Sequence, residues 1–300
     1  MGNQALDING FTNTVTANNH ITTRGSDWYF TVSAVMAFSM LIVMGLSFKR
    51  ARPNRLFHYL FASILLVSAI SYFCQGSNLG WTAIQTEFRR SDPEVAGIMR
   101  QIFYVRYIEY FITAPLLLTT LLLVSGLPTP TILYVLFMSE VMVIMGLVGA
   151  LVKSTYKWGF YTFGCVAFLF VAFSVVWEGR VYARAVGQDV LRNYTLCSSW
   201  LMLIWLVYPV VWGVSEGGNI IPPDSEAISY GVLDILAKPV FAALSLFGLR
   251  NLDFARLGLH FRDGRVAPGA GLGEKHTAGP AVGEPVAAPT AAGTTTSTAV

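Results

Sequence analysis

The sequence predicts an all-α membrane protein, built as one seven-transmembrane helix bundle with its N-terminus outside and its C-terminus in the cytoplasm. Three observations indicate this class. Hydrophobic residues make up 54% of the 300 residues and charged residues only 12%, a composition typical of integral membrane proteins. Apolar runs of about 20 residues, the length that crosses a bilayer as a helix, recur along the chain. Lys and Arg residues are concentrated in alternate connections between these runs.

The apolar runs are seven in number, and short polar breaks separate them. Turn-forming residues occupy the breaks, as in Arg52-Pro53-Asn54 and in the pair Gly217-Gly218. Short breaks make consecutive helices antiparallel neighbours, so we expect one bundle, and no alternating strand pattern competes with it. The runs lie near residues 28–48, 56–75, 100–124, 129–151, 158–177, 194–215 and 226–249.

The distribution of Lys and Arg predicts which ends of the helices face the cytoplasm. The first and fifth connections and the segment after the seventh run hold more of these residues than the opposite connections, so the positive-inside rule makes this side cytoplasmic. We predict an extracellular polar segment at 1–25, the bundle at 26–262 and a disordered cytoplasmic tail at 263–300. We expect this multi-pass protein in the plasma membrane. The basic residues are Lys49, Arg50, Arg52, Arg55, Arg180, Arg184, Arg192, Arg250, Arg256, Arg262 and Arg265.

The composition argues against several other classes of protein. A net charge of +3 is too small to indicate a nucleic-acid partner. Cys74, Cys165 and Cys197 all fall in apolar segments, which indicates neither a disulfide framework nor a metal site. We expect no enzymatic activity, and the lipid bilayer is the first partner that the sequence predicts.

Asp234 and Lys238 lie inside the seventh apolar run, where an ionised side chain is costly unless it is paired or functional. Their spacing of four places them one turn apart on the same helix face, so the amine and the carboxylate can meet. A structural ion pair between helices is one interpretation. The other is a covalent anchor, because a desolvated lysine amine readily forms a Schiff base with a carbonyl compound.

Further ionisable residues lie in the third and fourth runs. Arg106 and Glu109 are three residues apart, and hence neighbours on one helix face. If that face turns toward the seventh helix, the two join Asp234 and Lys238 in a group without net charge, as a water-poor site requires. Such a group is either structural or moves charge, and its central depth favours the second role. Glu140 faces a neighbouring helix or a second protomer, so a homo-oligomer is one expected assembly.

Aromatic residues follow one face of the sixth run. Trp205, Tyr208 and Trp212 lie at positions i, i+3 and i+7, and Pro209 between them should kink the helix. An aromatic stripe at helical spacing is more often core packing than a ligand wall. Beside the lysine of a neighbouring helix, however, it would suit a flat, conjugated, apolar ligand.

Three segments carry a more specific signal. They are residues 106–118 (RYIEYFITAPLLL), 205–212 (WLVYPVVW) and 233–241 (LDILAKPVF). In their order and in the helices that hold them, these segments resemble the microbial rhodopsins, and specifically the fungal opsins. The resemblance covers roughly residues 26–262. It implies a retinal-binding bundle in which Lys238 carries all-trans retinal as a protonated Schiff base.

The resemblance also implies roles for the other ionisable residues and a chromophore pocket. Asp234 is one counterion, and Glu109 stands at the position of the primary proton acceptor, with Arg106 beside it toward the outside. Glu216 and Glu226 resemble the family's extracellular proton-release pair. The apolar pocket fits green rather than blue absorption. The residues at pocket positions are Tyr72, Tyr110, Thr113, Leu117, Phe168, Trp205, Tyr208, Pro209 and Trp212.

The chain departs from the family's pattern at positions that matter for proton transfer. The acceptor is usually Asp, and Glu109 is one methylene longer, which permits proton acceptance but changes the distance and angle. Thr120 stands where the family usually has a carboxylate donor, about 16 Å further along the same helix face, and cannot supply a proton. Tyr110 replaces a Trp beside the acceptor. Ser139 and Ala114 replace an Asp and a Thr that often link the third and fourth helices.

Two functions follow from these residues, and the sequence leaves both open. The first is slow outward light-driven proton transport, with Glu109 as acceptor, Glu216 and Glu226 as the exit, and cytoplasmic reprotonation without a carboxylate donor. Recovery from the deprotonated intermediate should then slow as the pH rises. The second is a sensory photoreceptor that signals through a long-lived deprotonated intermediate without net pumping, which the missing donor and interhelical pair favour. A non-photochemical protein, like the relatives that lack the lysine, is disfavoured by Lys238.

Overall fold

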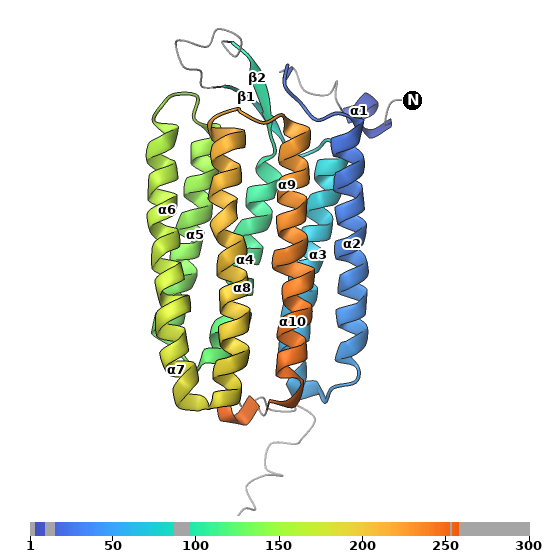
Figure 1. The fold of residues 1–300 in the computed structure, drawn as a ribbon. Helices are drawn as coiled ribbons and strands as arrows, with labels where there is room; N and C mark the ends of the chain where they lie inside the picture. The colour runs from blue at the N-terminus through green and yellow to red at the C-terminus, as the bar shows by residue number, and fades with distance from the viewer. Residues whose placement is uncertain (1–3, 10–15, 87–96, 253, 258–300) are drawn as a thin grey trace, which may run out of the picture. The chain divides into compact units, whose positions relative to one another are not determined.

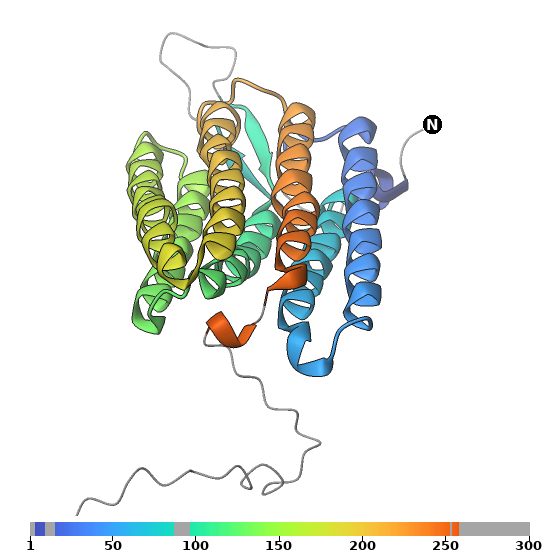
Figure 2. The same cartoon turned by 60° about the horizontal axis from the view of Figure 1, so that its bottom comes forward.

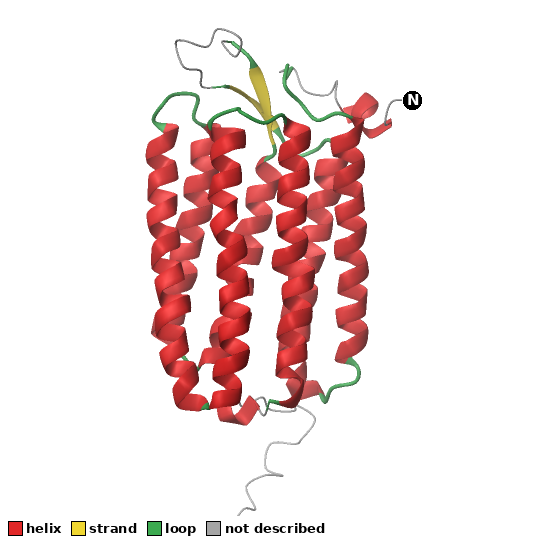
Figure 3. Cartoon of the chain, viewed as in Figure 1, coloured by secondary structure: helices red, strands yellow, loops and turns green. Residues whose placement is uncertain are grey.

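The computed structural model describes residues 4–9, 16–86, 97–252 and 254–257. Within these residues, seven helical spans are long and apolar enough to cross a membrane. Figures 1 and 3 show these spans side by side in one bundle, which confirms the predicted bundle of seven membrane-spanning helices. The predicted tail at 263–300 lies outside the described residues, as does part of the segment at 1–25, in which α1 spans Gln4–Asn9.

The spans agree with the predicted runs in number and order, but several are longer. The fifth reaches residue 186 and the sixth begins at residue 188, because polar residues at their ends still form helix. The helices are α2 (Thr23–Ser47), α3 (Leu56–Gly76), α4 (Tyr104–Ser125), α5 (Thr129–Leu151), α6 (Lys157–Phe173), α7 (Gly179–Val186), α8 (Gln188–Trp212), α9 (Pro223–Ile235) and α10 (Phe241–Gly248). Short 3-10 helices span Arg52–Arg55 between α2 and α3, and Leu249–Asn251 and Phe254–Leu257 after α10.

Three of the spans contain a π-helical turn. The turns are Ser174–Glu178 between α6 and α7, Gly213–Gly217 after α8, and Leu236–Val240 between α9 and α10. The last one contains Lys238 and Pro239, and proline has no N–H to donate to the regular helical ladder. Pro209 lies inside α8, and the π turn begins four residues after it. The lysine therefore sits where the helix backbone is locally widened.

A two-stranded antiparallel sheet lies between α3 and α4, where the sequence predicted no strand. β1 (Thr82–Gln85) pairs with β2 (Met99–Ile102), and Ile84 is opposite Arg100. Asn78 and Gly80 adopt left-handed φ angles of 57° and 72°, which turn the chain sharply after α3. The expectation that the third helix begins near residue 100 was therefore wrong, because its first residues form β2 and α4 begins at Tyr104.

The helices pack in chain order around a buried interior. α2 contacts α3, α3 contacts α4, α4 contacts α5 and α5 contacts α6, while α9 packs against α2 and α8 against α4 and α10. In Figures 1 and 2, α2 and α3 lie at one side of the bundle and α5 and α6 at the other. Large apolar side chains such as Phe38, Leu133 and Phe137 point outward and are more than half exposed, as a lipid-facing surface requires.

The two ends of the bundle differ in what they carry. The hairpin of β1 and β2 lies at the end where α9 begins, which we call the hairpin end (Figure 1). The basic connections that follow α2 and α7 lie at the opposite end. The sequence placed these connections on one side, and they do share one end of the bundle. That this end faces the cytoplasm stays a prediction.

Candidate functional site

Lys238 is almost fully buried in the middle of the seventh span. Its Nζ forms ion pairs with carboxylates from two spans, Glu109 on α4 and Asp234 on α9. The distance from Nζ to Oδ1 of Asp234 is 2.9 Å, across one helical turn. The predicted meeting of lysine and aspartate on one helix face is confirmed, and α4 adds the second acid.

The two carboxylates differ in their other partners. Asp234 accepts hydrogen bonds from Tyr72 at 2.5 Å, Tyr208 at 2.6 Å and Tyr110 at 3.3 Å. Both of its oxygens are thus stabilised as a carboxylate. Oε2 of Glu109, in contrast, is buried without a hydrogen-bond partner among the described residues. Protonation of Glu109 therefore costs less free energy than protonation of Asp234, because it disrupts fewer hydrogen bonds to the ionised carboxylate.

An apolar cavity of about 140 Å³ opens beside the lysine. Nine of the ten residues predicted to bind the cofactor line it; the tenth, Tyr72, instead holds Asp234. The predicted residues on the wall are Tyr110, Thr113, Leu117, Phe168, Trp205, Tyr208, Pro209, Trp212 and Lys238. Wall residues that sequence analysis missed include Met142, Gly146, Tyr161, Cys165 and Tyr230.

Hydrogen bonds and ring contacts fix the aromatic wall. Trp212 stacks on Tyr161 with ring centroids 5.1 Å apart and an interplanar angle of 22°. The indole of Trp212 donates to the Gly146 carbonyl at 3.2 Å, and the Tyr161 hydroxyl donates to the Pro209 carbonyl at 3.2 Å. The aromatic stripe of α8 thus lines a cavity. A reactive amine, flat apolar walls and two acids suit a conjugated aldehyde such as retinal.

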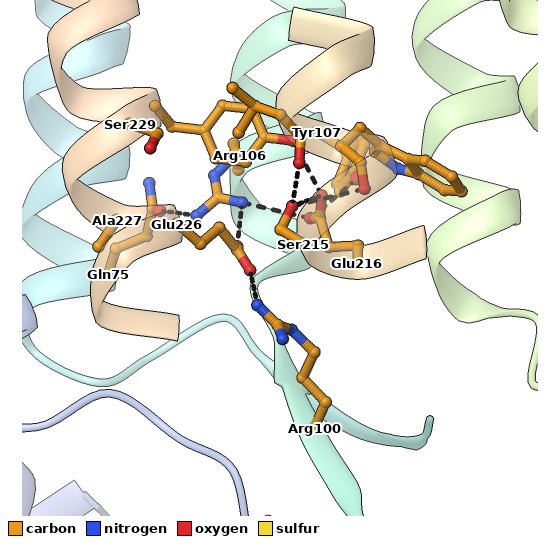
Figure 4. Close-up of polar contacts among 12 residues, drawn as sticks. Gln75, Arg100, Arg106, Tyr107, Ser215, Glu216, Glu226, Ala227 and Ser229 are labelled. Carbon is orange, nitrogen blue, oxygen red and sulfur yellow. Dashed lines mark hydrogen bonds and ion pairs between the residues drawn. The ribbon is translucent and has the colours of Figure 1, made fainter. Parts of the chain in front are cut away.

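A second polar cluster lies nearer the hairpin end and is centred on Arg106 (Figure 4). One nitrogen of its guanidinium group, Nη1, donates to Glu226 at 2.6 Å and to Glu216 at 3.2 Å. The other, Nη2, donates to the Tyr29 hydroxyl at 2.8 Å. The Tyr230 ring packs against this group, 4.1 Å from its central carbon. All of these side chains are buried.

The predicted four-residue group is therefore divided in two. Arg106 pairs with Glu216 and Glu226, whereas Glu109 and Asp234 surround Lys238. Helical side chains lean toward the N-terminus of their helix, and α4 begins at the hairpin end. The long Arg106 side chain consequently extends away from Glu109. The Lys238 amine is therefore paired with two acids, Glu109 and Asp234, and not with the group that holds Arg106.

Two buried cations in this region were not predicted from the sequence. Arg100 of β2 donates to Glu226 at 2.7 Å and is only 1% exposed. Lys157, at the start of α6, is 2% exposed and donates to the backbone carbonyl of Glu216 at 3.0 Å. Both residues stand at the ends of apolar runs, where basic residues are common, so no sequence pattern indicates that they are buried.

Two of the positions that depart from the family's pattern, Thr120 and Ser139, lie toward the end of the bundle opposite the hairpin. The Thr120 hydroxyl donates to the Leu117 carbonyl at 2.7 Å, and the Ser139 hydroxyl donates to the Leu136 carbonyl at 2.7 Å. Each hydroxyl thus bonds within its own helix. Glu140 is partly buried, and its Oε2 has no partner among the described residues.

Comparisons with known proteins agree with this geometry. A model of bacteriorhodopsin-like proteins matches residues 24–252. The chain is 52% identical to the opsin-like protein carO of Fusarium fujikuroi over 262 residues, which cover 87% of this chain and 85% of that protein. Similar solved structures include two light-driven proton pumps. The light-driven proton pump LR (Mac) from Leptosphaeria maculans is 32% identical, with a TM-score of 0.75 over 79% of this chain and 98% of that one.

The second structure is the light-driven proton pump CsR of Coccomyxa subellipsoidea. It is 34% identical, with a TM-score of 0.72 over 76% of this chain and 98% of that one. Both the family match and the relative at 52% identity span most of the bundle. The chain therefore belongs to the bacteriorhodopsin-like family of microbial rhodopsins, a family of membrane-embedded proteins that includes light-driven pumps and photoreceptors rather than enzymes and that generally binds retinal through a Schiff-base lysine.

Proposed function

We propose that this protein transports protons outward in response to light, slowly, with Glu109 as the proton acceptor. All-trans retinal would be held by Lys238 and by the aromatic walls of the cavity, among them Trp205, Tyr208 and Trp212. Retinal supplies a light-driven isomerisation that lowers the proton affinity of the nitrogen to which it is bound. The chain's own residues determine where the proton goes.

The contact between Lys238 and Glu109 is the observation that carries this proposal. Nζ is in direct contact with Oε1, so a proton can move between them without a water bridge. Oε2 of Glu109 has no partner in the described residues, while Asp234 is held as a carboxylate by three tyrosine hydroxyls. The proton therefore goes to Glu109, and Asp234 remains the fixed negative charge.

The route outward continues at the hairpin end. Arg106 lies on the same helix face as Glu109 and holds Glu216 and Glu226, which supports the role of this pair as the exit. The proposed direction rests on the positive-inside rule, which places the hairpin end outside. A light-driven proton pump from Leptosphaeria maculans with the same fold supports transport rather than another activity.

Reprotonation is the slow step of the proposed cycle. Thr120 stands at the donor position, but its hydroxyl is bonded to the Leu117 carbonyl and has no dissociable proton at physiological pH. Lys238 must then recover its proton from the cytoplasm through the opposite half of the bundle. The long wait for that proton makes net transport slow.

Light-induced pH changes in cells that express the protein with added retinal test the proposal. We expect the medium to acidify in the light, and acidification to be abolished by Glu109→Gln. The matched control is Glu140→Gln, which removes a carboxylate from the neighbouring α5 and should leave acidification intact. Alkalinisation of the medium, or unchanged acidification in Glu109→Gln, would contradict the proposal.

A sensory photoreceptor is the second candidate. Ser139 and Thr120 each bond within their own helix, so the interhelical link and the internal donor that support fast pumping are absent. The same slow recovery would then keep a signalling state populated. Voltage-clamp recording separates the two functions, because a pump gives a steady photocurrent and a sensor gives none.

A further inference from the structure

Arg100 lies on the hairpin side of the Glu216 and Glu226 pair and binds Glu226. Its guanidinium donates to Oε2 of Glu226 at 2.7 Å, to the Asn219 side-chain oxygen at 2.5 Å and to the Ile221 carbonyl at 2.8 Å. Figure 4 shows Glu226 between the guanidinium groups of Arg106 and Arg100. Arg100 thus joins the hairpin to the connection between α8 and α9 and to the charged interior.

The backbone of Arg100 is held on both sides. Ile84 of β1 is its partner in the hairpin, and Asn19 bridges to it from the segment before α2. The neighbour Gln101 donates its side-chain N–H to Asn78 at 2.6 Å and accepts from the Ile21 amide at 3.0 Å. A side chain anchored in this way keeps its place relative to the pair.

The two glutamates of the pair meet different donors. Each oxygen of Glu226 accepts a charge-assisted bond from a different arginine, at 2.6 Å from Arg106 and at 2.7 Å from Arg100. Glu216 receives Arg106 only at 3.2 Å, and its other main donors are the neutral hydroxyls of Tyr107 and Tyr230, each at 2.9 Å. Two guanidinium groups therefore stabilise the negative charge of Glu226 far more than that of Glu216.

We propose that Arg100 is a positioning residue that keeps Glu226 ionised, so that Glu216 is the carboxyl group that holds and releases the proton. Both glutamates accept a hydrogen bond from the same Arg106 nitrogen, so their carboxyl groups lie close together. Two negative charges this close repel each other, which favours a proton on one of the two glutamates. Glu216 is the less costly choice, because a buried neutral carboxyl needs no second cation. This inference rests on the proposed proton transport, for which it names the exit residue.

Infrared spectroscopy of the retinal-loaded protein in the dark tests the assignment. Spectra taken at successive pH values report the carbonyl stretch of protonated carboxyl groups. The charged and titratable groups that face the pair are Tyr29, Arg100, Arg106, Tyr107, Lys157 and Tyr230. We expect Glu216→Gln to remove one protonated-carboxyl band at neutral pH and Glu226→Gln to retain it. Loss of that band in Glu226→Gln alone would overturn the assignment.

A second set of variants tests the role of Arg100. Removal of a nearby positive charge favours a neutral carboxyl, so Arg100→Gln should move the midpoint of the band upward by about one pH unit or more. Arg100→Lys keeps the charge and should move it less. Arg24→Gln is the control, because Arg24 is an exposed cation near the start of α2. An unchanged midpoint in folded Arg100→Gln would refute the positioning role.

These measurements are independent of transport, since they need neither light nor a membrane potential. If no photocurrent is found but the band still belongs to Glu216, proton transport fails and the assignment stands. If a photocurrent is found but the band belongs to Glu226, proton transport stands and the assignment to Glu216 fails. Should Arg100→Gln not fold, the comparison of Glu216→Gln with Glu226→Gln still decides which glutamate carries the proton.

Discussion

The hydroxyl of Tyr72 on α3 donates a 2.5 Å hydrogen bond to Asp234 on α9, next to the lysine of the seventh span. This bond joins two spans that are far apart in the sequence. It also distinguishes the two acids beside Lys238, because Oε2 of Glu109 accepts no hydrogen bond from the described residues.

Tyr72→Phe should destabilise the protein without removing its colour. The change deletes one hydrogen bond to a buried carboxylate, which is worth about 1.5–3 kcal/mol. The midpoint temperature of unfolding should fall. It is measured as the temperature at which half of the visible absorption is lost. Tyr59→Phe is the matched control, since Tyr59 is an exposed tyrosine of the same helix. Equal midpoints for the two variants would show that the Tyr72 bond contributes little.

Lys238→Ala should abolish visible absorption after reconstitution with retinal. No other lysine is placed at the cavity wall by the structure of the described residues. Lys153→Ala removes an exposed lysine between α5 and α6 and should leave the absorption spectrum unchanged. A coloured Lys238→Ala protein would mean that retinal is held elsewhere, and both proposed functions would fail with it.

Glu109→Gln should mainly affect proton transfer, whereas Asp234→Asn should mainly affect thermal stability. Glu109→Gln removes the proposed acceptor, so flash spectroscopy should show no deprotonation of the chromophore, while the protein still folds. Asp234→Asn leaves Tyr72 and Tyr208 without an ionised partner and should lower thermal stability by more than Glu109→Gln does. Persistent deprotonation in Glu109→Gln would assign the acceptor role to Asp234 instead.

The bundle could be predicted from the sequence because the bilayer itself dictates the length and apolarity of each span. The hairpin could not. Its strands have only four residues each, and they depend on left-handed turns at Asn78 and Gly80 and on a bridge from Asn19. Such pairing comes from tertiary contacts, which leave no periodic pattern in a segment this short.

The site was predictable where burial of charge is costly. Asp234 and Lys238 stood out for that reason, and the pocket followed from the resemblance of three segments. Helical spacing placed Arg106 on the correct face but did not give the direction of its long side chain, which leads to Glu216 and Glu226. Arg100 could not be found, because its burial depends on the hairpin.

Thr120→Asp should speed the recovery of the dark state. In the unmodified protein, reprotonation depends on protons from the cytoplasm, so the recovery rate should fall in proportion to the proton concentration as the pH rises. An aspartate at this buried position, three helical turns from Glu109 on the same face, can store a proton and deliver it internally. Recovery should then become faster and nearly independent of pH, as measured by flash spectroscopy.

Thr119→Asp is the matched control for this change, since it adds the same acid one residue away on a different part of the helix surface. We expect its recovery to keep the pH dependence of the unmodified protein. A fast, pH-independent recovery without any substitution would mean that another group already donates the proton. In that case Thr120 would not limit the cycle, and slow transport would have no structural cause.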